Sequence, residues 1–255
     1  MYSITKAQLD QWVDRYHRVE FISDDPISIP HGFNLRQDIE ISGLMTALIS
    51  WGTRKAILKT AHQWMEAMDQ APFDFVMNSS PSDRKRMKAM IYRTFNGEDL
   101  LDLLHVLRSV YLEHRSLEEL FVPGFNSGGS LGGIVSFRSA MLQHSHHAHF
   151  EKHWANPISG SAAKRINMFL RWMVRKDERG VDFGIWNNIP MSALSIPLDV
   201  HSGKTARHWG LLERRQDDWK AVEELDAALR TFDPVDPVKY DFALFGAGVR
   251  NSFIK

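Results

Sequence analysis

Apolar residues recur every three or four positions along most of this 255-residue chain, which is the spacing of amphipathic helices. The pattern predicts longer helices over about 1–22, 35–50, 99–113, 162–176 and 217–231, with shorter helices between and after them. No segment alternates apolar and polar positions over the length of an ordinary strand. The predicted fold class is therefore all-α.

Capping residues and helix breakers suggest where several helices begin and end. Thr53 is placed to cap a helix after the interruption at Trp51 and Gly52, and Ser82 is placed to cap the basic helix that follows. Residues 123–130 are rich in glycine and serine, so we expect them to be the most flexible stretch of the chain.

Composition narrows the possible functions. The chain has 31 basic and 31 acidic residues, so a nucleic-acid-binding surface would have to be a local basic stripe. It has no cysteine, which excludes disulfides, cysteine-ligated zinc and iron–sulfur clusters. No apolar run approaches the roughly 18 residues of a membrane span, and the first residues lack the apolar core of a signal peptide. We expect a cytoplasmic protein that does not bind membranes.

Two short motifs join a turn to a helix that carries a chemically useful side chain. Residues 160–164 place Lys164 in the opening turn of one helix, and residues 197–201 place Asp199 at the start of another. An amine and a carboxylate are the groups needed when an amine attacks a glycosidic bond. Taken singly, such a lysine is usually solvated and such an aspartate is usually an N-cap. A capping aspartate still keeps one oxygen available, so both roles are compatible.

A basic stripe accompanies the lysine. Lys164, Asn167, Arg171 and Arg175 recur at helical spacing on a face away from the apolar stripe. The preceding turn, residues 158–161, is expected to expose backbone N–H groups in the same direction. Amides and a helix N-terminus together can bind a phosphate, and we expect them to do so here.

These motifs resemble the helix–hairpin–helix DNA glycosylase superfamily, and most closely its 8-oxoguanine glycosylase branches. Residues 160–164 resemble the hairpin with the catalytic lysine, although Ala162 stands where a second glycine is usual, and residues 197–201 resemble the aspartate segment. Residues 44–54 and 239–249 resemble the first barrel helix and the closing helix. Residues 164–177 are also similar to a bacterial branch of unknown function.

The resemblance implies a two-lobed fold, with a helical barrel lobe over 38–186 that ends in the hairpin and lysine helix. Residues 1–37 and 187–255 would form the second lobe. It further implies a monomeric DNA glycosylase and abasic-site lyase that excises a damaged purine, best guessed as 8-oxoguanine, from double-stranded DNA without metal or cofactor. Lys164 would form a Schiff base and Asp199 would stay ionised. The implied substrate-binding residues are Trp51, Gly52, Thr53, Arg54, Trp172 and His201, and the implied phosphate contacts are Gly160, Ser161, Ala162, Arg165, Arg171 and Arg207.

Several of these residues have ordinary alternatives. Core packing is the favoured role of Trp172, whereas Trp51 is equally suited to packing and to a pocket; His201 either orients Asp199 or packs. The tract from His144 to His153 offers two imidazoles, His149 and His153, four positions apart. No carboxylate stands near them at ligand spacing, so phosphate contact or a structural role is favoured over a metal site. The competing functions are a non-catalytic DNA-binding protein of the same fold and a histidine-dependent metallohydrolase.

Overall fold

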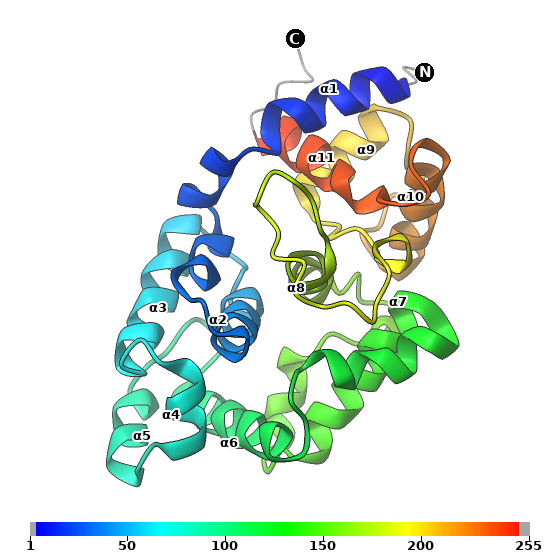
Figure 1. The fold of residues 1–255 in the computed structure, drawn as a ribbon. Coiled ribbons are helices and arrows are strands. Elements are labelled where there is room, and N and C mark those ends of the chain that lie inside the picture. Colours follow the sequence, from blue (N-terminus) through cyan, green and yellow to red (C-terminus); the bar gives the residue numbers. More distant parts are fainter. Residues whose placement is uncertain (1–3, 250–255) are drawn as a thin grey trace. The chain divides into compact units, whose positions relative to one another are not determined.

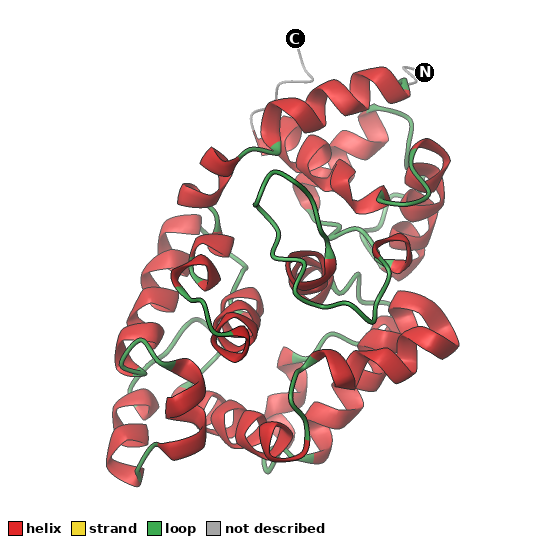
Figure 2. Cartoon of the chain, in the orientation of Figure 1, coloured by secondary structure: helices red, strands yellow, loops and turns green. Residues whose placement is uncertain are grey.

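The computed structural model describes residues 4–249, and within that range the chain is helical with no strand (Figures 1 and 2). Two isolated bridges, Tyr92 with Phe95 and Ser161 with Asp218, are its strand-like pairings. No helix in this range combines the length and apolarity that a membrane crossing requires. The predicted all-helical class is confirmed for the described residues.

The chain divides into two compact units, each with its own helices. Unit 1 comprises residues 4–23, 129–131 and 156–249, and unit 2 comprises 24–128 and 132–155. This division differs from the predicted lobes. The hairpin and lysine helix, expected at the end of the barrel lobe, belong to the same unit as Asp199, and residues 24–37 belong to the other.

Unit 2 is built around α2, in which ten consecutive residues from Ile39 to Leu48 are buried. Buried Glu40 accepts hydrogen bonds from the Tyr111 hydroxyl at 2.8 Å, the Ser116 hydroxyl at 2.6 Å and the Leu117 N–H at 3.0 Å. These bonds compensate the burial of its carboxylate and tie α2 to neighbouring helices. The elements of this unit are α2 (Arg36–Leu48), α3 (Arg54–Ala67), α4 (Pro72–Asn78), α5 (Pro81–Lys88), α6 (Gly97–Glu113), α7 (Glu118–Gln143) and the 3₁₀ helices Pro26–Ser28, Pro30–Gly32 and Ala148–His153.

Two predicted caps have different outcomes. The Thr53 side chain accepts a hydrogen bond from the Ala56 N–H and caps α3, as predicted. The cap of α5 is Ser80 rather than Ser82, because Ser80 and Asp83 form a reciprocal capping box. Pro81 occupies the first helical turn, where its missing N–H costs nothing.

The glycine-rich stretch is a packed helical bend instead of a flexible loop. Gly129 adopts φ +59° inside α7, and Phe121 stacks on Phe137 with ring centroids 4.1 Å apart. A Cβ added at Gly124 would lie 2.0 Å from the carbonyl oxygen of Gly132, so the two arms of α7 touch through their backbones. Glycine is required here because a close backbone approach leaves no room for a side chain.

Unit 1 surrounds α11, which packs against α1 and α9 (Figure 1). The predicted first helix is shorter than expected: α1 ends at Tyr16, buried His17 follows, and residues 1–3 lie outside the described range. A long loop containing only one 3₁₀ turn connects α8 to α9 (Figure 2). The elements are α1 (Lys6–Tyr16), α8 (Lys164–Val174), α9 (Val200–His208), α10 (Trp219–Phe232), α11 (Tyr240–Val249) and the 3₁₀ helices Val19–Asp24, Pro157–Ser159, Met191–Ala193 and Pro237–Lys239.

Candidate active site

The predicted hairpin is a tight turn fastened to the start of α10. After the 3₁₀ turn Pro157–Ser159, Gly160 takes φ +90°, a conformation that favours glycine. Its carbonyl accepts a hydrogen bond from the Trp219 N–H at 3.1 Å, and Ser161 forms the bridge with Asp218. The turn that leads to Lys164 is therefore held by α10.

The hairpin's amides are already occupied, contrary to the predicted phosphate site. The N–H of Ile158 donates to the Asn156 side chain, and the N–H groups of Ser159 and Ser161 donate to the Asn156 carbonyl. The Gly160 N–H donates to the Pro157 carbonyl. Because the turn satisfies its own donors, amides of residues 158–161 do not offer the free hydrogen bonds that we expected.

Lys164 is the first residue of α8 and is half-buried. The preceding residue, Ala163, is buried and adopts φ +48°, an uncommon conformation for a residue with a side chain. This left-handed turn sets the direction in which the chain enters α8. The predicted position of Lys164 in the first turn of a helix is confirmed.

Asp199 is the N-cap of α9, as its sequence context predicts. Its Oδ1 accepts from the N–H of His201 at 2.8 Å and from Ser202, whose N–H lies at 3.0 Å and hydroxyl at 3.2 Å. Within residues 4–249, no hydrogen bond engages its Oδ2. The half-buried carboxylate thus caps with one oxygen and keeps the other available.

A buried carboxyl on α11, Asp241, interacts electrostatically with both the lysine and the aspartate. Burial raises the pKa of Asp241 to about 6, and the charges of Arg171, Asp199 and Lys164 also shift this pKa. Lys164, at the start of α8, and Asp199, at the N-cap of α9, thus interact electrostatically with the same carboxyl. The packing of α11 against α9 brings Asp199 there, and the ion pair of Asp241 with Arg171 joins α8 to α11.

Arg171 does not belong to a phosphate-binding surface. Its side chain is 4% exposed, and it forms ion pairs with Asp182 at 3.2 Å and with Asp241. Its guanidinium also lies over the ring of Phe242, 4.4 Å from the centroid. The predicted basic stripe is therefore wrong at this position, because Asp182 from the loop after α8 and Asp241 from α11 pair with the buried arginine.

Arg175 continues the same buried network. It pairs with Asp182 at 3.0 Å, with Asp236 at 2.8 Å and with Asp177. These carboxylates raise its pKa well above the ordinary value despite burial. The helix period correctly grouped Arg171 with Arg175, the C-cap of α8, but both side chains are buried in the protein.

The other residues of unit 1 that were predicted to contact DNA phosphate are at least partly exposed, unlike Arg171. Gly160 and Ser161 are exposed and Ala162 is half-buried. Arg165 is also half-buried, and burial lowers its pKa. The Arg207 guanidinium donates to the Arg214 carbonyl and to Asp217, each at 2.7 Å, so its donors are partly occupied within the unit.

The predicted substrate-binding residues separate by unit and by exposure. In unit 1, the Trp172 side chain is fully buried, so it packs in the interior rather than stacking on a base. His201 is exposed and approaches the Phe245 ring edge-on, with centroids 6.2 Å apart. Its backbone N–H, not its ring, makes the hydrogen bond to Asp199.

Trp51, Gly52, Thr53 and Arg54 belong to unit 2. Trp51 is 36% exposed, and the Arg93 guanidinium lies 4.6 Å from the centroid of its ring. Gly52 has φ +111°, and a Cβ there would lie 2.7 Å from the same guanidinium. Thr53 caps α3, and Arg54 lies 3.8 Å from an Asp25 oxygen.

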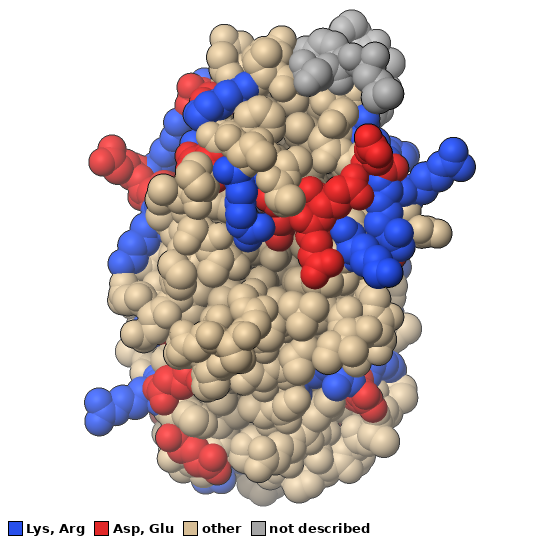
Figure 3. Space-filling view, turned by 90° about the vertical axis from the view of Figure 1, so that its right-hand side faces the viewer, with Lys and Arg blue, Asp and Glu red and all other residues tan. Residues whose placement is uncertain are grey.

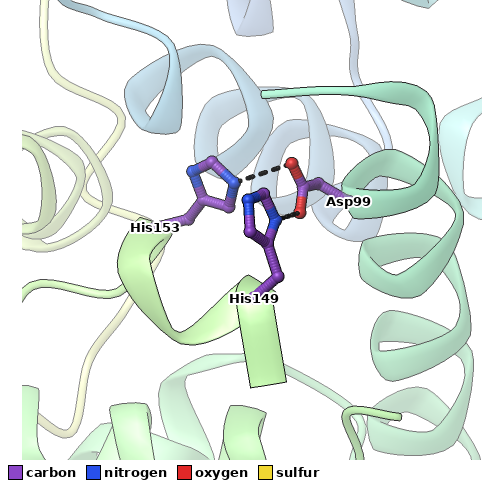
Figure 4. A group of neighbouring side chains, drawn as sticks. All are labelled: Asp99, His149 and His153. Atoms are coloured by element: carbon purple, nitrogen blue, oxygen red, sulfur yellow. Dashed lines mark hydrogen bonds and ion pairs between the residues drawn. The ribbon is translucent and has the colours of Figure 1, made fainter. Parts of the chain in front are cut away.

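A second cluster lies in unit 2, where Asp99 approaches two histidines of the predicted tract (Figure 4). Its Oδ1 lies 2.8 Å from His149 Nδ1, and its Oδ2 lies 3.0 Å from His153 Nε2. Asp99 is the carboxylate that sequence reasoning missed. The available signal was local: Asn96 and Asp99 form a capping box at the start of α6, which places the aspartate but does not reveal its partners.

Unit 1 also contains a cavity of about 530 Å³ whose lining includes His17, Arg175 and Asp177. His17, Asp177 and Asp182 present their ligand-type atoms within 4.8 Å of one another. However, Nη1 of Arg175 is paired with both aspartates. The guanidinium occupies the position that a metal ion would need, so this cluster is an ion-pair network.

Comparison of the chain with curated proteins and with solved structures finds no match. A family model described as "Protein of unknown function (DUF2400)" matches residues 25–250, which includes Lys164, Asp199 and Asp241 as well as the cluster at Asp99. The chain belongs to this family.

Proposed function

We propose that this protein is a two-lobed DNA glycosylase of the helix–hairpin–helix type with associated abasic-site lyase activity. It acts on a damaged purine in double-stranded DNA, with 8-oxoguanine the first substrate to test, and it works as a cytoplasmic monomer. The proposal rests on the positions of Lys164 in the first turn of α8 and of Asp199 at the N-cap of α9, and on the electrostatic interaction of both with buried Asp241. The hairpin that leads into α8 and the free Oδ2 of Asp199 support it further.

In the proposed reaction, the damaged nucleotide is flipped out of the duplex. The Lys164 amine forms a bond to C1′ while the bond from C1′ to the base nitrogen breaks, and the base leaves with the bonding electrons and gains a proton. Asp199 stabilises positive charge on the sugar and accepts protons from the amine through Oδ2. Opening of the sugar ring gives a Schiff base. Loss of a proton from C2′ then expels the 3′ phosphate and nicks the strand.

The DNA contacts need revision relative to the sequence-based set. Arg171 and Trp172 are interior, so the proposed contact surface retains the hairpin with Ser161 and Ala162, together with Arg165 and Arg207. On the face drawn in Figure 3, acidic and basic side chains are interspersed instead of being separated by sign. Because Arg171 is interior and Arg207 is paired with Asp217, binding would depend on few phosphate contacts and would show a modest dependence on salt.

Borohydride trapping on a panel of lesion-containing duplexes tests the chemistry directly. Wild-type protein should form a covalent adduct, and Lys164→Gln should abolish it. Lys204→Gln, which changes an exposed lysine on α9, is the matched control and should trap normally. Asp199→Asn should slow trapping by about 10²- to 10⁴-fold, the range of a lost acid–base group.

The same experiments distinguish a glycosylase from the competing function, a non-catalytic DNA-binding protein. Binding to the duplexes in a shift assay, without an adduct on any lesion, would identify a non-catalytic DNA-binding protein. An adduct that persists in folded Lys164→Gln would show that another amine reacts. Circular dichroism of each variant distinguishes these outcomes from simple unfolding.

A further inference from the structure

We propose that Asp99, His149 and His153 form a binding site for one divalent transition-metal ion of the zinc type. The three side chains come from the first turn of α6 and from the 3₁₀ helix Ala148–His153, about 50 residues later in the chain. Figure 4 shows both imidazole rings directed at the same carboxylate. The site belongs to unit 2 and is independent of the proposed glycosylase chemistry.

The spacing of the donor atoms suits a first coordination sphere. Nitrogen and oxygen ligands about 2.1 Å from an ion lie roughly 3.0 Å apart at a right angle and roughly 3.4 Å apart at the tetrahedral angle. Here the two nitrogen–oxygen separations are 2.8 Å and 3.0 Å. One donor atom from each of the three residues falls within a mutual distance of 4.8 Å. Small rotations of the side chains would make room for an ion.

Two of the three ligands are held before any ion arrives. Asp99 is 1% exposed and receives the Asn96 N–H at 2.9 Å on Oδ2. His153 is 4% exposed and packs against Phe95, with ring centroids 4.3 Å apart. His149 is more than half exposed, with its side chain at 55%. A buried pair with one exposed ligand gives the ion a route from solvent.

The donor set indicates the class of ion. Imidazole nitrogens favour zinc, cobalt and nickel over magnesium or calcium, which prefer oxygen ligands throughout. Three protein ligands leave a fourth position for water, as in open zinc sites rather than closed structural ones. The addition of Asp99 to the two histidines therefore supports a metal site, which the histidine tract alone did not.

Lys152 is the charged group that competes with the ion. Its Nζ lies 3.9 Å from Asp99 Oδ2 and close to His149 Nε2. Its side chain is 37% exposed, so it can turn toward solvent when an ion binds. Removing its charge should therefore tighten binding, because the ion no longer has to displace an ammonium group.

The test uses the full-length protein without a histidine tag. Equilibrium dialysis against Zn²⁺, followed by elemental analysis, should give one ion per chain at neutral pH, with weaker binding on acidification because the imidazoles must be neutral. Co²⁺ should produce the visible absorption of a low-coordinate site. His149→Ala and His153→Ala should each weaken Zn²⁺ binding at least 10-fold, and Lys152→Met should strengthen it.

His147→Ala is the matched control, since His147 is exposed in the same tract but outside the cluster. It should bind Zn²⁺ as the wild type does. Stoichiometric binding that survives His149→Ala and His153→Ala, or that falls equally with His147→Ala, would show adsorption by the tract as a whole. Absence of binding to the wild type would mean that Asp99 only pairs with the two histidines. Either result overturns the proposal.

Discussion

Asp226 should make the protein less stable as the pH rises. This residue of α10 is 4% exposed, and its Oδ1 accepts the Ile196 N–H at 2.9 Å in the loop that leads to Asp199. Burial raises its pKa from 3.8 to about 6, although Arg230 lies 3.6 Å from Oδ2. The folded state therefore holds the carboxyl proton more tightly than the unfolded state does.

The sign and size of this pH dependence follow from the linkage between proton binding and folding. Below pH 3.8 the group is protonated in both states and contributes nothing, whereas above pH 6 the folded state carries the full cost of a buried carboxylate. A pKa difference of about two units corresponds to about 3 kcal/mol, of which about 2.5 kcal/mol develops between pH 4 and pH 8. Asp226→Asn keeps the acceptor for Ile196 and cannot ionise. Its stability relative to wild type should rise by that amount over the same interval.

Urea denaturation of both proteins at pH 4, 5, 6, 7 and 8 measures this difference. Glu223→Gln, which removes an exposed carboxylate from the same helix, is the control and should follow the wild type closely. A constant difference between Asp226→Asn and wild type across the pH range would refute the reasoning. So would a variant that loses stability as the pH rises.

Two further substitutions test the packing within each unit. Arg171→Met should destabilise the protein by about 3–5 kcal/mol in urea, because it leaves the Asp241 carboxylate buried without its partner; a loss below about 1 kcal/mol would contradict the network. Gly132→Ala should lower the free energy of unfolding by at least about 2 kcal/mol, and with it the melting temperature, since its Cβ would lie 2.3 Å from the Gly124 carbonyl oxygen. Gly128→Ala meets no atom within 4 Å and should be nearly neutral, so equal effects of the two alanines would exclude the proposed close contact.

Local sequence was sufficient for features that depend on a few neighbouring residues. Thr53 and Asp199 cap helices because their side chains reach amides only two or three positions away. The position of Lys164 in a first helical turn follows from the turn before it. The helical class itself follows from the period of the apolar residues, which any core-facing helix must show.

Contacts between distant segments were not available from the same patterns. The helix period predicts a basic stripe that includes Arg171, but it cannot tell which carboxylates other segments will bring. In the fold, Asp182 and Asp241 pair with this arginine, which is buried. Asp99 meets His153 only through the fold, and no spacing rule connects positions so far apart. Composition predicts a flexible stretch at residues 123–130, but glycine permits both mobility and close packing, and composition alone does not distinguish the two.

The packing of α1 on α11 has a consequence for synthesis on the ribosome. α1 precedes unit 2 in the chain and its partner α11 follows it, so the apolar side chains of Leu9 and Val13 lack that partner while unit 2 is synthesised. Unit 2 is nearly continuous in the chain and can collapse during that interval. The nascent protein therefore carries an amphipathic helix without its packing partner until α11 has been synthesised.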